Sequence, residues 1–254
     1  MKHQNFLDWN YKILVNSLKK IDFNIILIVL LDALFYLFSI FIFNYLLKTI
    51  FLRMASINLP QGMESLPLDK LQLIVKDSQN FFYMLILSFV LVMLAMIFLA
   101  SIIKCIIWAK TTKTKITLKL ISKFFILNLA WMGFWLALIV AIAFFVDQYS
   151  VALFSYIALF LGIYFTNSLY SIFIKNPTFK AVKQALKLST QKIHLFILPY
   201  VLIFLVLYII IKLSSLPQSQ YLSFMFAIVL LLCLAAFRYY ISGLVFELKK
   251  THDF

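Results

Sequence analysis

Six long apolar runs restrict what this chain can fold into more than any other feature of its sequence. They cover approximately residues 24–47, 81–107, 124–146, 151–174, 195–211 and 221–246. As an α-helix, each can cross about 30 Å of hydrocarbon, and a helix satisfies its own backbone polar groups there. The sequence therefore predicts an all-α, polytopic membrane protein, with six transmembrane helices in one integral membrane domain covering residues 1–254.

Charge and composition exclude the common soluble classes. Of the 254 residues, 65% are hydrophobic and 13% are charged, whereas soluble domains are about 25% charged. The formal net charge of +14 would suit nucleic-acid binding if the lysines formed a patch on a soluble domain. Here they flank the apolar runs instead, so membrane topology explains them and we expect no nucleic-acid partner.

The basic residues alternate between the two sides of the predicted membrane. Of the 23 lysines and arginines, 18 fall on the side that holds both termini and 5 on the other. Basic residues accumulate in cytoplasmic segments. We therefore expect the chain to cross a plasma or inner cell membrane several times, with both termini on the cytoplasmic side. The segment 49–80 then becomes an extracytoplasmic loop, in which the run "NLPQGMESLPLDK" (58–70) breaks helices. From Ser65 a helical pattern resumes, with Pro67 in its first turn, so the second span is expected to extend outward by several turns.

A lysine-rich segment, "NPTFKAVKQALKLSTQK" (176–192), predicts an amphipathic helix in the inner membrane interface. Asn176 and Pro177 suit a helix start, and apolar residues from Phe179 to Ile193 share one face beside the lysines. Similar patterns precede the first span and, less cleanly, the third (111–125). We therefore expect three hairpins, each preceded by a basic interfacial helix that contacts anionic head groups or a partner protein. The lysines assigned to these contacts are Lys12, Lys19, Lys113, Lys115, Lys119, Lys180, Lys183 and Lys187.

Asp32 is the acidic residue that lies deep in a predicted span, about 12 Å from its start. An intramembrane carboxylate is a candidate for an ion or proton path, and the alternative is a structural aspartate held by hydrogen bonds. Its candidate partners are Asn44, Asn128, Asn167 and Arg238. Arg238, like Lys104, is expected to extend to the inner surface rather than to pair with Asp32.

No motif for catalysis or cofactor binding occurs in the sequence. The three histidines (His3, His194 and His252) lack metal-ligand spacing, and four glycines form no phosphate-binding loop. The chain is therefore expected to be non-catalytic, without metal or cofactor.

The segment "FKAVKQALKLSTQKIHLFILPY" (179–200) resembles a loosely defined group of prokaryotic six-helix membrane domains. That group includes the membrane domain fused to some glycerophosphodiester phosphodiesterases. Its members similarly repeat a basic interfacial helix with small residues, like Ala181, Ala185 and Ser189 in this chain. The catalytic domain of those proteins has no counterpart here. The chain also resembles permease subunits of ATP-binding-cassette exporters, which have an interfacial helix before six spans.

Two function classes follow from these patterns. In the first, the protein is a non-catalytic membrane component that organises lipids or partner proteins through its basic cytoplasmic helices. In the second, it is a permease-like transport subunit, in which Asp32 and the asparagine-bearing spans line a path.

Overall fold

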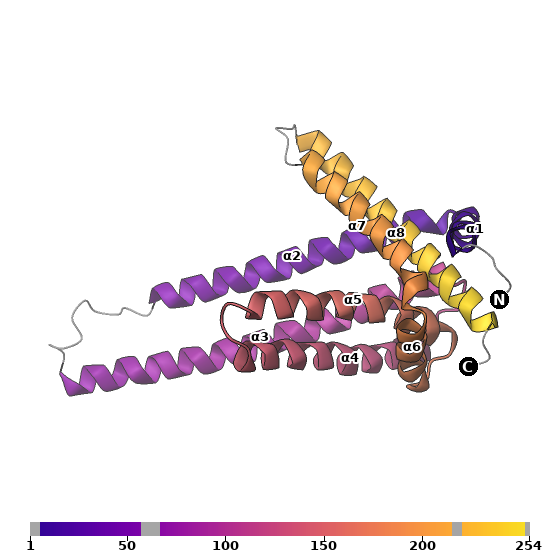
Figure 1. Cartoon of the computed structure of the whole chain (residues 1–254). Helices are drawn as coiled ribbons and strands as arrows, with labels where there is room; N and C mark the ends of the chain where they lie inside the picture. Colours follow the sequence, from indigo (N-terminus) through magenta and orange to yellow (C-terminus); the bar gives the residue numbers. More distant parts are fainter. Residues whose placement is uncertain (1–5, 57–66, 215–219, 252–254) are drawn as a thin grey trace. The chain divides into compact units, whose positions relative to one another are not determined.

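The computed structural model describes residues 6–56, 67–214 and 220–251, and all secondary structure in these ranges is helical (Figure 1). Six helices are long and apolar enough to cross a membrane, which confirms the prediction of an all-α chain with six candidate spans and agrees with a multi-pass membrane protein. The helices are α1 (Phe6–Lys19), α2 (Asn24–Ser56), α3 (Leu68–Thr111), α4 (Leu118–Phe145), α5 (Val151–Lys175), α6 (Lys180–Gln191), α7 (Ile193–Ser214) and α8 (Gln220–Thr251).

The helix before the predicted loop 49–80 is longer than expected. α2 continues to Ser56, and α3 begins at Leu68 and runs for 44 residues. The loop prediction is therefore wrong for residues 49–56, which continue α2, whereas the extension of the second span by several turns is confirmed. The helix breakers Pro60, Gly62 and Pro67 are confined to the middle of the segment, and the flanking residues propagate the helix. Residues 57–66 lie outside the described residues.

The chain divides into two compact units. Unit 1 comprises residues 1–33 and 101–254, and unit 2 comprises residues 34–100. Unit 1 therefore holds α1, α4 to α8, the start of α2 and the end of α3. Unit 2 holds the remaining parts of α2 and α3.

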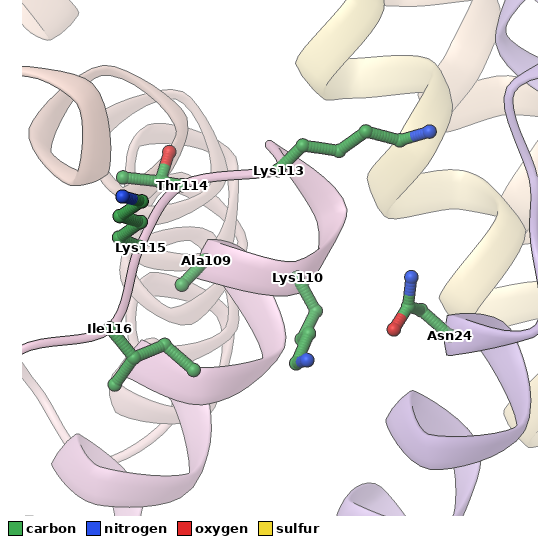
Figure 2. A pocket seen from close by; sticks show the side chains of 7 residues that line it. All are labelled: Asn24, Ala109, Lys110, Lys113, Thr114, Lys115 and Ile116. Atoms are coloured by element: carbon green, nitrogen blue, oxygen red, sulfur yellow. The ribbon is translucent and has the colours of Figure 1, made fainter.

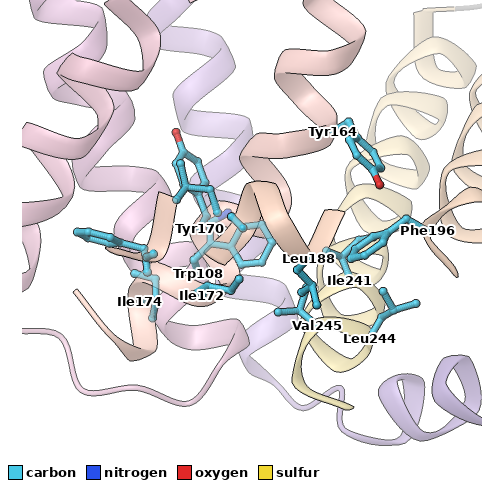
Figure 3. Close-up of a cluster of buried hydrophobic side chains, with 14 of the residues drawn as sticks. Trp108, Tyr164, Tyr170, Ile172, Ile174, Leu188, Phe196, Ile241, Leu244 and Val245 are labelled. Atoms are coloured by element: carbon cyan, nitrogen blue, oxygen red, sulfur yellow. The ribbon is translucent and has the colours of Figure 1, made fainter. Parts of the chain in front are cut away.

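In unit 1, α5 packs against α4, α6 and α8, and α8 also packs against α1 and α7. The interior is rich in aromatic side chains: the ring of Phe124 lies 4.8 Å from Tyr170 and 5.9 Å from Phe173, centroid to centroid. Part of this cluster is drawn in Figure 3, where Trp108 and Tyr170 lie next to each other. Such rings bury a large area and interact edge to face, so they hold the ends of α3, α4 and α5 together.

Several helix ends meet at one end of unit 1. Lys113, after α3, pairs with Asp22, before α2, at 3.3 Å. Lys123, near the start of α4, donates to the carbonyl oxygen of Pro177, after α5, at 3.2 Å. α6 joins the end of α5 to the start of α7. The basic segments of the sequence are therefore gathered at this end.

Two of the three segments predicted to be interfacial form separate helices, α1 and α6. The third does not, because residues 112–117 are not helical and α4 begins directly at Leu118. Thr117 has an extended backbone, and its hydroxyl accepts a hydrogen bond from Leu120 N at 3.1 Å. This N-cap starts α4 and excludes a separate helix before it. The predicted start at Asn176 is also wrong: Asn176 caps the end of α5, and α6 begins at Lys180.

Candidate functional site

Asp32, on α2, is held by two cations from other helices of unit 1. Lys104 Nζ, on α3, donates to Asp32 Oδ1 at 2.9 Å. Arg238, on α8, contacts both carboxylate oxygens, with Nη2 lying 3.1 Å from Oδ1. The side chain of Asp32 is fully buried, and those of Arg238 and Lys104 are 10% and 18% exposed. We call these three residues the charge cluster.

The prediction that Arg238 and Lys104 extend to the surface is therefore wrong. An ionised carboxylate in a low-dielectric interior is stable only when opposite charges and hydrogen bonds replace its water. A cation that left for the surface would leave Asp32 without that compensation. The charge cluster carries one negative and two positive groups, and it joins α2, α3 and α8.

Asn128 belongs to a second buried polar group rather than to the charge cluster. Its Nδ2 donates to the hydroxyl of Ser101 at 2.9 Å, and its Oδ1 accepts from the hydroxyl of Tyr170 at 2.5 Å. Asn128 and Ser101 are fully buried. Ser101 precedes Lys104 by three residues on α3, so this asparagine network and the charge cluster join the same part of α3 to different neighbours.

Asn167 takes part in a third polar group, which links α5, α6 and α7. Its Nδ2 donates to the hydroxyl of Tyr200 at 3.1 Å, and that hydroxyl donates to Tyr164 O at 3.1 Å. The hydroxyl of Tyr164 in turn donates to Ser189 O, on α6, at 2.8 Å. Tyr164 therefore fixes α6 to α5, and Asn167 joins α5 to α7.

Asn44 has a different environment from the other candidate polar residues. It is an exposed residue of unit 2 and lines an open hollow of about 420 Å³ with Ser39, Ile40, Ile42, Phe43, Val92 and Met96. Of the four partners considered for Asp32, the structure pairs only Arg238 with it within the described residues.

α6 has three faces rather than the two that its sequence pattern predicts. Ala181, Ala185, Leu188 and Ser189 are buried against the bundle, because small residues allow helices to approach closely. The apolar residues Phe179 and Leu186, followed by Ile193 of α7, are 60%, 37% and 54% exposed. The exposed lysines form the third face, which adjoins the apolar one, and they are Lys180, Lys183 and Lys187.

α1 repeats this arrangement. Asn10, Ile13 and Ser17 face the bundle and are buried, and Tyr11 and Leu18 form an exposed apolar face. The exposed lysines Lys12 and Lys19 lie beyond it. With about 100° between successive residues, the faces of α1 and α6 follow in the same rotational order: packed, apolar, basic.

A glycine allows α1 to approach α8 closely. A Cβ at Gly243 would lie 2.3 Å from Ser17 Oγ and 3.6 Å from Ile13 Cγ2. Near this contact, the hydroxyl of Tyr240 donates to Asn10 Oδ1 at 3.0 Å. The position of α1 is therefore determined by its packed face.

Lys113, Lys115 and Lys119 are exposed but do not belong to an interfacial helix. Lys113 and Lys115 line an open pocket of about 290 Å³ that also includes Asn24 and Lys110. Lys113 extends on the side of Asn24, and Lys115 lies on the opposite side of the α3 end (Figure 2). Lys119 lies in the first turn of α4.

Lys113 occupies the left-handed conformation, with φ 55°. Thr114 N donates to Ala109 O at 2.8 Å and Lys113 N to Lys110 O at 3.2 Å, which is the Schellman motif that usually has glycine at this position. The conformation is strained for lysine, but it directs the side chain to Asp22. Partial burial acts to raise the pKa of Asp22, but hydrogen bonds from Asn24 and Lys113 outweigh it and hold that pKa below its ordinary value.

Sequence reasoning missed the roles of Ser101 and Asp22, and it expected Lys104 at the surface rather than beside Asp32. Lys104 lies within the predicted second span, and a cation inside an apolar run is a signal that could have identified it. Ser101 and Asp22 carry no such signal, since serines are common in membrane helices and Asp22 lies outside the spans. Among the described residues, no group of three His, Cys, Asp or Glu side chains could hold a metal ion.

Comparisons with protein-family models, curated proteins and solved structures found no match to this chain.

Proposed function

We propose that this chain is a non-catalytic protein of the plasma or inner cell membrane, which binds and organises anionic lipid at its cytoplasmic face through α1 and α6. The observation that carries the proposal is the shared order of faces on these two helices. Each helix is fixed to the bundle by one face, exposes apolar residues on the next, and exposes lysines beyond them.

An exposed apolar face beside a lysine face suits the boundary between acyl chains and head groups. In water, Phe179, Leu186 and Ile193 would leave a row of apolar surface uncovered. At the interface those side chains contact acyl chains, and Lys180 and Lys183 reach the head groups with their apolar stems in the boundary. Each lysine near an anionic surface contributes about 1 kcal/mol.

The contacts between helix ends support the orientation inferred from the distribution of lysines. The Asp22–Lys113 ion pair and the contact between Lys123 and Pro177 bring the starts of α2 and α4 to the ends of α3 and α5. This is the arrangement expected of three membrane hairpins whose ends lie on one side. Without Lys104 and Arg238, which belong to the buried charge cluster, 16 basic residues lie on that side and 5 on the other, so we place this side, both termini, α1 and α6 in the cytoplasm.

The charge cluster supports a structural role for Asp32 in this proposal. A residue that carries protons must change its charge during transport, whereas both carboxylate oxygens of Asp32 are bound to cations. The cluster joins three helices of unit 1, and so it stabilises the bundle on which α1 and α6 are fixed. The hypothesis of a permease-like subunit stays a prediction.

The test is lipid retention by the full-length protein in nanodiscs of mixed phosphatidylcholine and phosphatidylglycerol, measured by native mass spectrometry. The triple variant Lys180→Gln, Lys183→Gln, Lys187→Gln is expected to weaken phosphatidylglycerol binding roughly 100-fold, on about 1 kcal/mol per lysine. The matched control removes the same charge from the predicted outer side, as Lys48→Gln, Lys76→Gln, Lys212→Gln. Equal loss in the two variants would overturn the proposal.

A further inference from the structure

Two lysines from different helices lie against one aromatic ring at the basic end of unit 1. Lys175 Nζ, at the end of α5, lies 4.0 Å from the centroid of the Phe246 ring, and Lys250 Nζ, at the end of α8, lies 4.7 Å from it. The face of an aromatic ring attracts cations. Phe246 therefore holds together two ammonium groups that repel each other.

A third lysine is oriented toward the same place by an amide. In the orientation that satisfies both of its polar ends, the Asn176 side chain donates to Lys175 O at 3.0 Å and accepts from Lys249 Nζ at 3.2 Å. Lys20, which follows α1, is close enough to act electrostatically on Lys175, as are Lys249 and Lys250. These lysines thus converge from three helices.

Among the described residues, the charged groups that act on Lys175 are lysines. The carboxylate of Glu247 lies 3.8 Å from Lys250 Nζ, so it offsets one of four ammonium charges. Helix dipoles attract cations to the ends of α5 and α8, which explains lysines at each helix end. The dipoles do not explain why ammonium groups from two helices contact one ring although they repel each other.

We propose that Lys175, Lys249 and Lys250, arranged around Phe246, form a binding site for a phosphate group. A phosphate carries at least one negative charge and several acceptor oxygens, so it can accept hydrogen bonds from several ammonium groups at once. Charge-assisted hydrogen bonds of this kind are stronger than those between neutral groups. The ring and the Asn176 amide hold the lysines near one another before the anion binds, which reduces the entropy lost on binding.

The phosphate can belong to a lipid head group or be free in solution. The lipid source rests on the proposed function, because that function places this end of unit 1 at the anionic inner leaflet. The site differs from the lysine faces of α1 and α6 in one respect that can be measured. A site made of converging groups saturates with one phosphate, whereas a lysine face attracts many anionic lipids without a fixed number.

The experiment compares two variants of the full-length protein with the same loss of charge. The first is Lys175→Gln, Lys249→Gln, Lys250→Gln, and the second is Lys180→Gln, Lys183→Gln, Lys187→Gln. Each is placed in phosphatidylcholine nanodiscs and titrated with inorganic phosphate, with sodium chloride at equal ionic strength as the control. In a second arm, phosphatidylglycerol replaces part of the phosphatidylcholine. The readouts are the midpoint of thermal unfolding and the number of retained lipids by native mass spectrometry.

We expect one saturable ligand on the wild-type protein, and binding at least about tenfold weaker in the first variant, because two or more charge-assisted hydrogen bonds are lost. The second variant should keep that saturable ligand, even if it fails to retain further phosphatidylglycerol. A response to inorganic phosphate identifies free phosphate as a source, and a response to phosphatidylglycerol identifies the lipid.

Two outcomes would overturn the phosphate site. One is the absence of any saturable ligand in both arms, and the other is equal weakening in the two variants. The proposed function is tested separately: it is contradicted if the second variant retains as much phosphatidylglycerol as the wild-type protein. If the first variant does not fold, two single variants, Lys250→Gln and Phe246→Ile, replace it. Lys250 is 59% exposed, and the isoleucine removes the ring that holds the lysines, so both should weaken the saturable binding.

Discussion

The helices α5 and α2 differ in a way that hydropathy alone would not suggest. α5 is the least apolar of the six candidate spans, yet 50% of its most apolar 18-residue window is buried. α2 is among the most apolar, and 11% of the corresponding window is buried. The buried part of α5 contains Tyr164, Ser168, Tyr170 and Ser171.

The difference shows how a membrane interior is assembled. Lipid tails are as apolar as leucine, so burying an apolar side chain between helices gains little over leaving it in lipid. Hydrogen bonds, ion pairs and close packing of small residues then decide which faces meet. In unit 1 these are the charge cluster, the asparagine network of Asn128 and the contact at Gly243, whereas the α2 and α3 segments of unit 2 expose most of their apolar side chains.

The largest expected effect tests whether the charge cluster holds unit 1. In Asp32→Ala, Lys104 and Arg238 remain buried without their counter-charge, and we expect a loss of roughly 3–5 kcal/mol in the free energy of unfolding. Reversible unfolding in detergent measures it, with Asn44→Ala in unit 2 as the control, which should change stability by less than about 0.5 kcal/mol.

A second variant separates a structural role of Asp32 from a role in transport. Replacing the whole cluster, as Asp32→Leu, Lys104→Met, Arg238→Leu, should restore most of the lost stability, because apolar residues of similar size often replace a buried ion pair without loss. A triple variant no more stable than Asp32→Ala would contradict this account.

The next effect concerns the asparagine network. Asn128→Leu leaves the Tyr170 hydroxyl without its buried acceptor and removes the hydrogen bond to Ser101, and an unsatisfied buried group costs about 1–3 kcal/mol. Combined with Tyr170→Phe, the loss should be smaller than the sum of the two single losses, because the two side chains share one hydrogen bond. Additive losses in the same unfolding assay would mean that the two residues act independently.

A smaller and more local effect is expected at Gly243. Gly243→Val must displace Ser17 and α1, and overpacking of this kind costs about 1–3 kcal/mol; we expect the low end, because the Ser17 hydroxyl can rotate away. Limited proteolysis between α1 and α2 should become faster. Gly133, where an added Cβ meets nothing within 4 Å, provides the control Gly133→Val, and equal cleavage in both variants would contradict the close packing of α1.

The smallest effect is the pH dependence of the Asp22–Lys113 ion pair. Since the pKa of Asp22 is lowered in the folded protein, its stabilising contribution is present above the ordinary pKa of an aspartate and is lost as the pH falls through the lower, folded value. Asp22→Asn should therefore lower the unfolding midpoint at pH 7, and the difference from wild type should shrink in acid. For an exposed pair we expect less than about 1 kcal/mol. A difference that is constant down to pH 2 would exclude this explanation.

Sequence reasoning found the elements of this fold more successfully than their contacts. The apolar runs predicted all six candidate spans, and the lysine-rich segments predicted α1 and α6. Sequence reasoning failed before α4, where Thr117 caps the helix directly, and at residues 49–56, where α2 continues into the predicted loop. The resemblance to the prokaryotic six-helix domains, the single-domain assignment and the absence of catalysis stay predictions.

The candidate site divides in the same way. Asp32 was predicted from its position alone, because a carboxylate inside an apolar run is improbable without a role. Arg238 and Lys104 were expected at the membrane surface instead of beside Asp32, because the sequence carries no information about which helix faces which. The cluster around Phe246 is likewise not visible in the sequence, where Lys175 and Lys250 are 75 positions apart.

The sequence by itself determined that this chain forms membrane-spanning helices and where its basic segments lie. Both properties depend on the local transfer of residues between water and lipid, which each segment settles independently. Only the tertiary structure decided that Asp32 meets Lys104 and Arg238, and that α1 and α6 present the same three faces. In lipid those contacts depend on polar groups and small residues that must match across helices, so they exist only once the helices are packed.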